Sequence, residues 1–357
     1  MLYIVYTTGR CNLNCEYCGG SFPEHKVPAK PLYEVKQLKR FMEGDEEPII
    51  AFYGGEPLLN AEFIEEVMDS FERCRFVAQT NATLIDRLPA KYWRRMDAVL
   101  ISIDGRREVT DGYRGPGVYD LALRGAAKLR SMGFKGDLIA RMTLSRRSDL
   151  YKDVTHLLSL KLFDHVHWQL DLIWSPRWPG LDRWVEGYRE ALSRLFKLWL
   201  TSLREGEVLG IAPFLGVLKH LLTRSPVEAP PCGAGSSSVA LLTNGLVLAC
   251  PIAVDEEWAR VGRLDLDSWR TVRGKVRVEE PCPSCSIFNL CGGRCLYTNK
   301  ERLWGEDGFK TLCELTSRLI YLIQRSLGEV EDLLRRGVVG PEELLYPPFN
   351  NTIEVIP

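Results

Sequence analysis

The chain has 357 residues, a formal net charge of -1 and a sequence pI near 6.6. This charge gives no polycationic surface, so the composition argues against nucleic acid as a partner. The amino terminus starts with apolar, strand-like residues and not with a basic signal-peptide region, and no apolar run is long enough to span a membrane. We therefore expect a soluble, cytoplasmic protein of roughly two domains, without a nucleic-acid or membrane partner.

Cysteine is the unusual feature of the composition. The chain contains 11 cysteines, and all but Cys74 fall in clusters. Disulfides are rare in a reducing compartment, so this clustering indicates metal ligation. Cys74 lies in an apolar stretch and is predicted to be a buried thiol that packs as a small hydrophobic side chain.

Strand-like and helix-like segments alternate along the first half of the chain. Strands are predicted at Leu2–Thr7, Pro48–Tyr53, Cys74–Gln79, Ala98–Ile103, Asp137–Leu144 and His165–Ile173. Helical periodicity marks segments between them, at Ala61–Phe71, Tyr119–Met132 and Asp149–Leu160. Six βα units predict an α/β fold, a partial (β/α)6 TIM-like barrel with its chemistry at the carboxyl ends of the strands.

The second half has a different organisation. A helical region over 185–222 precedes SPVEAPPCGAGSSS, whose Pro, Gly and Ser indicate a domain boundary. VALLTNGLVLAC then predicts a β-hairpin around Asn244-Gly245, followed by a cysteine-rich loop and an amphipathic helix over 309–336. The predicted division is a barrel, a helical connector, a small cysteine-rich domain and a C-terminal tail, at 1–205, 206–231, 232–330 and 331–357.

Cys11, Cys15 and Cys18 follow the first predicted strand in a CX3CX2C motif. Three thiolates on one short loop can hold three irons of a four-iron cluster and leave the fourth iron open to a small molecule. The alternatives are a zinc site or a set of buried thiols. Zinc normally takes four ligands, and the next cysteine is Cys74, so the cluster is favoured.

Together with YGGEP at the end of the second strand, this loop resembles the radical S-adenosylmethionine (SAM) enzymes. The resemblance covers the aromatic Tyr17 before the last cysteine and the run Gly54, Gly55, Glu56 and Pro57. It implies a [4Fe-4S] cluster whose open iron is chelated by the amino and carboxylate groups of SAM. The glycine pair is expected to let the backbone approach this ligand, and Glu56 to accept from the SAM ammonium.

Other SAM contacts are implied by shorter resemblances at the later strands. Gln79 and Asn81 lie in VAQTNATLI, Ser102 and Asp104 in LISIDG, and Arg141 in ARMTL, where the resemblance pairs it with the SAM carboxylate. A single polar residue at a strand end is as often structural, but all of these share the carboxyl ends of strands. A further resemblance makes DGYRG, residues 111–115, a loop near the substrate, with Arg114 as a candidate contact.

The carboxy-terminal third contains seven more cysteines whose spacing resembles the SPASM domain of the same enzymes. They are Cys232, Cys250, Cys282, Cys285, Cys291, Cys295 and Cys313. The resemblance implies two auxiliary [4Fe-4S] clusters, a distal one on Cys282, Cys285, Cys291 and Cys313 and a nearer one on Cys232, Cys250 and Cys295. With three cysteines, the nearer cluster keeps an open iron or takes a non-cysteine ligand. A zinc-ribbon-like fold is the alternative.

Two further groups of residues have both a functional and a structural interpretation. His165 and His167 alternate onto one face of the sixth strand, either as ligands or, as favoured here, as satisfied core or rim histidines. Trp168, Trp174, Trp178 and Trp184 either line a substrate groove or, the favoured interpretation, pack the rim of the barrel.

The resemblance implies reductive cleavage of SAM to a 5′-deoxyadenosyl radical, which removes a hydrogen from a peptide or protein to form a thioether or carbon-carbon crosslink or to epimerise a residue. It also implies an anaerobic setting and a ferredoxin or flavodoxin donor. The first strand begins at residue 2, so a separate leader-recognition protein is expected. The alternatives are Ser or Cys oxidation as in sulfatase maturases, which have Asp where this chain has Pro251, small-alcohol dehydrogenation, and non-catalytic electron transfer.

Overall fold

The computed structural model describes residues 1–171 and 177–347, which form two compact units. The first unit comprises Met1–Ile103, Thr110–Ile139 and Cys232–Arg277. The second comprises Asp104–Val109, Ala140–Pro231 and Val278–Pro357. Strand β5 (Asp137–Leu144) passes from the first unit to the second.

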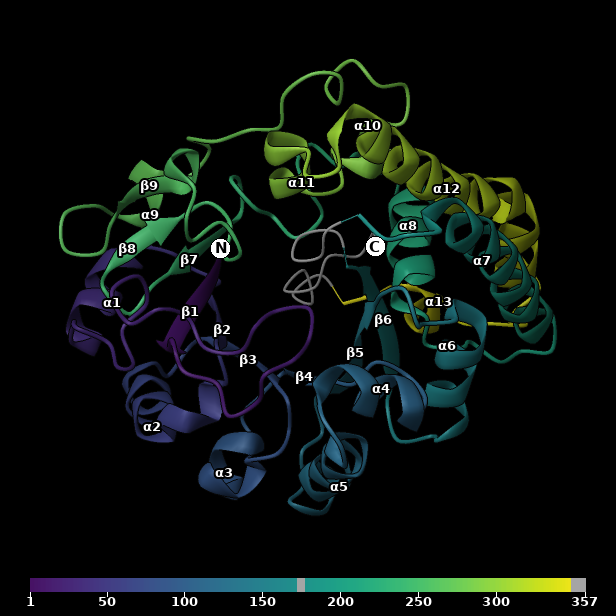
Figure 1. Ribbon diagram of the computed structural model, residues 1–357. Helices are drawn as coiled ribbons and strands as arrows, with labels where there is room; N and C mark the ends of the chain where they lie inside the picture. The colour runs from purple at the N-terminus through teal and green to yellow at the C-terminus, as the bar shows by residue number, and fades with distance from the viewer. Residues whose placement is uncertain (172–176, 348–357) are drawn as a thin grey trace. The chain divides into compact units, whose positions relative to one another are not determined.

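The first unit is built on parallel strands (Figure 1). They are β1 (Leu2–Thr8), β2 (Ile49–Gly54), β3 (Arg75–Thr80) and β4 (Ala98–Ser102), and each pairs with the next in parallel register. On its other edge β1 pairs in parallel with β7 (Ser238–Leu241), which continues through antiparallel β8 (Leu246–Leu248) and β9 (Arg260–Arg263). The strands read as nearly continuous buried runs because both faces of the sheet are covered.

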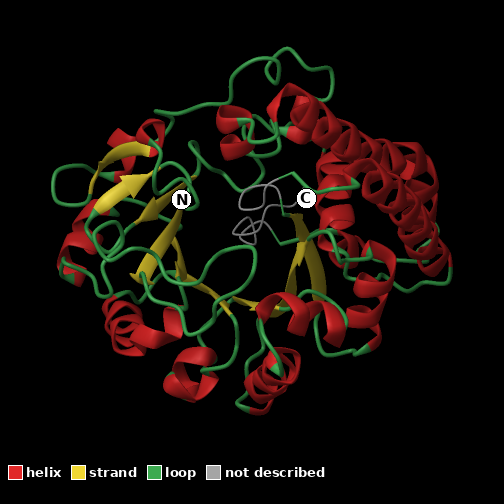
Figure 2. Ribbon diagram, in the orientation of Figure 1, coloured by secondary structure: helices red, strands yellow, loops and turns green. Residues whose placement is uncertain are grey.

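Short and medium helices complete the first unit (Figure 2). They are α1 (Val35–Phe41), η1 (Pro57–Asn60), α2 (Ala61–Ser70), η2 (Ile85–Arg87), α3 (Ala90–Trp93), α5 (Val118–Ser131), η3 (Glu257–Ala259) and α9 (Trp269–Val272). Helix α2 buries Phe63, Ile64, Val67 and Met68, spaced as one face of an amphipathic helix.

The second unit contains the neighbouring strands β5 and β6 (His165–Leu170) and most of the long helices. The helices are α6 (Leu150–Ser159), α7 (Leu181–Arg204), α8 (Ala212–Thr223), α10 (Phe288–Cys291), α11 (Leu296–Glu301), α12 (Gly305–Arg335) and α13 (Pro341–Leu344). Helices α7 and α12 lie side by side, linked by the ion pairs Arg189–Glu314 and Arg204–Glu329.

All six predicted strands are present, with ends that differ by up to one residue in the first five. The sixth ends at Leu170, and the predicted residues 172 and 173 lie outside the described residues, as do Trp174 and residues 348–357 of the tail. One local prediction is wrong: residues 111–114 belong to helix α4 (Arg107–Arg114) and do not form a loop. No helix in the described part of the chain combines the length and hydropathy needed to cross a bilayer.

Candidate functional site

The CX3CX2C motif forms a tight loop just past the end of β1. The backbone N–H groups of Cys18 and Gly19 both donate to the carbonyl of Cys15, at 3.2 and 3.0 Å. Cys15 is buried, Cys11 is half-buried and Cys18 is exposed. The loop therefore gathers three thiols while keeping that of Cys18 open to solvent.

The three thiols act on one another electrostatically. The pKa of Cys18 is lowered to about 6, mainly by a hydrogen bond from Cys15 and also by the Arg114 guanidinium. Burial raises the pKa of Cys11, and the neighbouring groups of Glu56 and Cys18 raise it too. Because thiolates are the ligands of iron-sulfur clusters, a mutually interacting trio of this kind fits the predicted cluster.

The carboxyl-terminal part of α4, which belongs to the first unit, supports this loop. The N–H of Glu16 donates to the carbonyl of Tyr113 at 2.9 Å, and the rings of Tyr17 and Tyr113 lie 5.6 Å apart. The Arg114 guanidinium sits 5.4 Å from the centre of the Tyr17 ring. Tyr17 and Arg114, both buried, thus hold the cysteine loop against α4.

A small amide network ties the loop to the end of β3. Asn81 donates through Nδ2 to Asn12 Oδ1 at 2.9 Å, and Asn12 donates in turn to Thr83 Oγ1 at 2.8 Å. The Thr83 hydroxyl closes the ring by donating to Asn81 Oδ1 at 2.7 Å. Asn12 is a position that the sequence analysis missed, because a single Asn between two cysteines carries no spacing signal.

The two glycines of GGEP are required by the chain itself. A Cβ at Gly54, whose φ is 136°, would lie 2.2 Å from the carbonyl oxygen of Thr8, and one at Gly55 would lie 2.2 Å from that of Arg10. The close approach that demands glycine is therefore to the end of β1 and the start of the cysteine loop. Pro57 is buried, and its carbonyl accepts from Thr7 Oγ1 at 3.0 Å.

Glu56 is almost completely buried and well hydrogen-bonded. Its Oε1 accepts from Thr80 Oγ1 at 2.7 Å and from the N–H of Leu58 at 3.1 Å, and its Oε2 accepts from the N–H of Asn81 at 2.8 Å. Burial raises the pKa of Glu56 to about 7 despite these donors. A carboxylate offers about four acceptor positions, so within the described residues Oε2 keeps one for a cationic ligand.

The remaining predicted contacts are placed as follows. In the first unit, Gln79 is half-buried on β3 and Ser102 is buried at the end of β4. In the second unit, Asp104 is fully buried, and its Oδ1 accepts from the N–H of Thr143 at 2.8 Å, which is a structural role. Arg141 is half-buried and donates to the Met142 carbonyl at 2.9 Å and to Gln169 Oε1.

Four of the seven later cysteines come together in the second unit. Burial raises the pKa values of Cys282 and Cys313 and raises that of Cys291 to about 12. Neighbouring thiols raise these pKa values as well. Cys285 raises those of Cys282 and Cys313, and Cys282 and Cys313 raise that of Cys291. These four thiols, which come from separate loops and from α12, are the ones expected for the distal cluster, and that assignment stays a prediction.

Asn299 supports this thiol quartet and was not predicted. It is 2% exposed, and its Nδ2 donates to Cys282 Sγ at 3.4 Å and to the Glu279 carbonyl at 2.9 Å. Its Oδ1 accepts from the N–H of Glu279 at 2.7 Å. The amide therefore fixes the backbone that leads into Cys282.

The other three SPASM-like cysteines are distributed over both units. Cys232 and Cys250 belong to the first unit, where Cys250 is buried and lies close enough to act on the pKa of Tyr6. Cys295 belongs to the second unit, is buried, and its Sγ accepts from the N–H of Thr298 at 3.5 Å. No disulfide joins any of the 11 cysteines.

A site for a single metal ion is a different arrangement. Across residues 1–171 and 177–347, no three His, Cys, Asp or Glu side chains converge closely enough to ligate one ion. In a four-iron cluster each cysteine binds a different iron, so its ligands lie further apart than those of one zinc ion.

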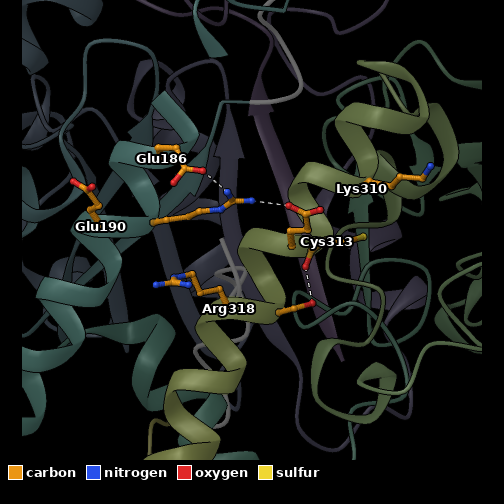
Figure 3. A pocket seen from close by; sticks show the side chains of 8 residues that line it. Glu186, Glu190, Lys310, Cys313 and Arg318 are labelled. Atoms are coloured by element: carbon orange, nitrogen blue, oxygen red, sulfur yellow. Dashed lines mark hydrogen bonds and ion pairs between the residues drawn. The ribbon is translucent and has the colours of Figure 1, made fainter. Parts of the chain in front are cut away.

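A pocket of about 740 Å³ lies in the second unit, where α7 faces α12 (Figure 3). Glu186 and Glu190 project from α7, and Lys310, Cys313 and Arg318 from α12. Arg189 links the two helices by ion pairs to Glu186 and Glu314. Cations and anions are equal in number along this lining, so the pocket has no strong preference for either charge.

His167 on β6 differs from its prediction as a satisfied histidine. It is 0% exposed, and both ring nitrogens have no hydrogen-bond partner among the residues that the structure describes. Trp168 follows its favoured interpretation: it is fully buried, its ring packs 6.0 Å from that of Phe214, and its Nε1 donates to Tyr188 Oη at 3.2 Å.

Comparison with known proteins decides the family. Residues 5–149 match the model of the Radical SAM superfamily. The matched region, residues 5–149, belongs to this superfamily. The cysteine loop, the GGEP run and β1 to β4 all lie inside the matched region, so this radical SAM enzyme carries the family's [4Fe-4S] and SAM chemistry there.

Curated relatives extend the similarity over most of the chain. This radical SAM protein is 22% identical over 329 residues to the cysteine-type anaerobic sulfatase-maturating enzyme of Clostridium perfringens (strain 13), covering 82% of this chain and 88% of that protein. It is 26% identical over 310 residues to the mycofactocin maturase MftC of Mycobacterium tuberculosis, covering 81% and 76%.

Solved structures show the fold. Native anSMEcpe with bound AdoMet and Cp18Cys peptide has a TM-score of 0.71 at 19% identity, over 94% of this chain and 99% of that chain. Streptococcus suis SuiB bound to precursor peptide SuiA has a TM-score of 0.56 at 15% identity, over 84% and 73%. The α/β prediction, with six parallel strands followed by hairpin strands and C-terminal helices, is confirmed.

Proposed function

We propose that this enzyme reductively cleaves SAM at the loop of Cys11, Cys15 and Cys18 and uses the resulting radical to modify a peptide or protein. The observation that carries this proposal is the trio of mutually interacting thiols next to the buried carboxylate of Glu56. A ligand that binds there meets both metal-binding thiols and an acceptor for its amino group.

Each residue of the site has a definite task in this proposal. Cys11, Cys15 and Cys18 would hold a [4Fe-4S] cluster, and Glu56 accepts from the SAM ammonium through the remaining position on Oε2. When bound, the cluster and SAM supply the reductive cleavage that yields a 5′-deoxyadenosyl radical. The buried Tyr17 and Asn81 keep the loop in place and help to exclude water.

The auxiliary clusters follow from the later cysteines. The quartet Cys282, Cys285, Cys291 and Cys313 would hold the distal [4Fe-4S] cluster, which the mutual effects of these thiols support. By resemblance, Cys232, Cys250 and Cys295 would hold the nearer one, with an open iron or a non-cysteine ligand. Gln79, Ser102, Asp104 and Arg141 remain proposed SAM contacts.

A peptide or protein is the substrate class that we propose. Support comes from the MftC and sulfatase-maturating relatives and from the anSMEcpe and SuiB structures, both of which hold a peptide. The proposed modification is a thioether or carbon-carbon crosslink, or epimerisation. An open iron on the nearer auxiliary cluster would suit a cysteine-containing peptide, because it could bind the substrate thiolate.

Oxidation of a Ser or Cys side chain is the second candidate, and the likeness to the sulfatase-maturating enzyme favours it. The position after the second SPASM-like cysteine counts against it. Here it is Pro251, whose carbonyl accepts from Tyr6, so it offers no carboxylate as a base. Small-alcohol dehydrogenation has no supporting feature in the described residues.

The proposed setting follows from the cysteine content. Exposed thiol ligands such as Cys18, Cys285 and Cys313 indicate clusters that need a reducing, anaerobic cytoplasm. A ferredoxin or flavodoxin would deliver the electron. A separate leader-recognition protein is proposed to present the peptide.

The test is anaerobic incubation of the reconstituted enzyme with reductant, SAM and short peptides encoded beside its gene, in heavy water, followed by mass spectrometry. Loss of two hydrogens is expected for a crosslink or oxidation, and uptake of one deuterium without net hydrogen loss for epimerisation. Cys18→Ala is the control and must form no 5′-deoxyadenosine. If wild-type protein that holds about twelve irons in three four-iron clusters forms no 5′-deoxyadenosine either, the proposed function is wrong.

A further inference from the structure

The turn that joins Cys291 to Cys295 in the second unit has an unusual backbone. Gly292, Gly293 and Arg294 all adopt left-handed conformations, with φ angles of 60°, 79° and 54°. Glycine adopts such angles without strain, whereas a residue with a Cβ atom is strained there. Arg294 is therefore the exception in this turn.

Hydrogen bonds of the turn hold this conformation in place. The N–H of Arg294 donates to the carbonyl of Cys291 at 2.9 Å, and the N–H of Cys295 donates to the carbonyl of Gly293 at 2.6 Å. Glycine at position 294 would form the same turn without strain. A strained residue that persists in a fixed turn indicates that its side chain has a function.

The side chain of Arg294 is buried, with 7% of its surface exposed. Burial raises the pKa values of Cys291 and Cys313, and the positive charge of Arg294 acts in the opposite direction on both thiols. The same charge opposes the effect of burial on Tyr188 of α7, whose pKa is raised to about 12. The guanidinium therefore lies close to the thiol quartet inside the second unit.

A second arginine near the quartet is in a different situation. Arg302 also acts on Cys282 and Cys313, but it is half-buried and forms an ion pair with Glu306. Its charge is offset by that carboxylate and screened by water. Arg294 is the more deeply buried of the two cations, so its charge acts more strongly on its surroundings.

The charge of an iron-sulfur cluster determines what such a cation does. A [4Fe-4S] cluster on four thiolates has a net negative charge, and reduction makes that charge larger. A guanidinium is permanently positive, so beside such a cluster it favours the reduced state. The cluster in turn would provide the negative charge that a buried cation needs.

We propose that Arg294 raises the reduction potential of the distal cluster by placing a permanent positive charge beside the thiol quartet. This inference rests on the proposed function, which assigns a [4Fe-4S] cluster to these cysteines. The step on which Arg294 acts is the uptake of one electron, lost by the ferredoxin or flavodoxin donor, and no covalent bond forms or breaks. The strained turn keeps the guanidinium in position for this role.

The test is a reductive titration followed by electron paramagnetic resonance. The parent protein carries Cys11→Ala, Cys15→Ala and Cys18→Ala, so that only auxiliary clusters contribute. The signal that disappears on adding Cys282→Ser belongs to the distal cluster. Adding Arg294→Gln instead is expected to shift the equilibrium of this cluster at least about ten-fold towards the oxidised state. This corresponds to a midpoint potential lower by about 59 mV for one electron.

Three further substitutions in the same parent separate charge from structure. Arg294→Lys keeps the charge and should retain most of the parent's potential. Arg294→Gly removes both the charge and the backbone strain, and is expected to lower the potential as Arg294→Gln does. Arg325→Gln is the matched control, because Arg325 is exposed and lies roughly 18 Å further along α12 than Cys313. Its removal should leave the potential unchanged.

The inference is overturned if Arg294→Gln leaves the potential unchanged or raises it, or if Arg294→Lys lowers it equally. Iron analysis decides the case in which Arg294→Gln loses the cluster. Retention by Arg294→Lys then supports the role of the charge, and loss in both variants overturns it. If the parent and its Cys282→Ser variant hold equal iron, the distal cluster itself is wrong, and the inference is wrong with it. Formation of 5′-deoxyadenosine by the wild-type enzyme tests the radical function separately.

Discussion

The hydroxyl of Tyr6 donates a hydrogen bond of 2.6 Å to the carbonyl oxygen of Pro251, 245 residues later in the chain. Tyr6 is fully buried on β1, and its ring packs edge-on against those of Phe22 and Tyr53. The bond fixes the residue that follows Cys250, a proposed ligand of the nearer auxiliary cluster. The first strand of the chain therefore helps to position a cysteine of its last third.

We expect Tyr6→Phe to lower the free energy of unfolding by about 1–3 kcal/mol, because the Pro251 carbonyl loses its donor in a buried site. Denaturant titration of the cluster-free protein measures this. Tyr321→Phe is the control, since Tyr321 is 55% exposed and its change should stay within about 0.5 kcal/mol. Equal unfolding midpoints for the wild type and Tyr6→Phe would show that the bond contributes nothing.

Asn81→Ala should loosen the cysteine loop, because it removes the bond to Asn12 and the acceptor of Thr83. Loss of one such hydrogen bond changes an equilibrium constant about five-fold. Iron should therefore leave the Cys11 loop at least about five times faster in the presence of a chelator. The exposed Asn289 in the second unit provides the control Asn289→Ala. Equal release rates in all three proteins would exclude a role of the amide network.

Binding of SAM should depend on the protonation of Glu56. The pKa of Glu56 is raised to about 7 by burial, so at lower pH the carboxyl is protonated and loses its charge attraction for the SAM ammonium. We expect the SAM dissociation constant to rise by up to about ten-fold per pH unit below 7. Glu56→Gln should bind SAM weakly and without this pH dependence. A wild-type affinity that is constant between pH 6 and 8 would contradict the role of Glu56.

The same carboxyl makes a second prediction, about stability. Its pKa rises from an ordinary 4.5 to about 7 on folding, so between these values the folded state binds more protons than the unfolded state. Its contribution to the unfolding free energy of the cluster-free protein therefore decreases as the pH rises from 4.5 to 7. Denaturant titration across this range should show that the unfolding free energy of the wild type falls relative to that of Glu56→Gln as the pH rises.

The thiol quartet should bind iron as one unit. Cys282→Ser and Cys313→Ser are each expected to lose about four irons of the reconstituted protein, and the double variant no more than either single one, since one cluster is lost in every case. Iron analysis with electron paramagnetic resonance of the reduced protein measures this. Cys74→Ser is the control with full iron content. Additive losses in the double variant would assign the two cysteines to different clusters.

Much of the fold was predictable because each strand of the sheet is a short local pattern. Apolar, β-branched runs mark β1 to β6, and Asn244-Gly245 marks the β7–β8 hairpin. The parallel pairing of β7 with β1 was not predicted, because a pairing across more than 200 residues leaves no trace in local periodicity. Helix α4 was missed because the resemblance of DGYRG to related enzymes predicted a loop at residues 111–115.

The residues of the candidate site were likewise predictable only in part. Cys11, Cys15 and Cys18 were predicted from their spacing on one short loop, and Glu56 from the resemblance of the GGEP run to the radical SAM enzymes. Asn12 and Asn299 were not, since a supporting amide is defined by the groups that surround it. The reason for the glycines of GGEP also changed: Gly54 and Gly55 make room for the carbonyls of Thr8 and Arg10.

The sequence by itself determined the chemistry of this protein: which thiols are available, at which spacing, and beside which strand ends. Only the tertiary structure decided the environments of these groups, because burial and electrostatic fields arise from segments that are distant in the chain. It raised the pKa of Glu56, brought Cys313 to Cys282, Cys285 and Cys291, and left His167 buried without a hydrogen-bond partner in the described residues.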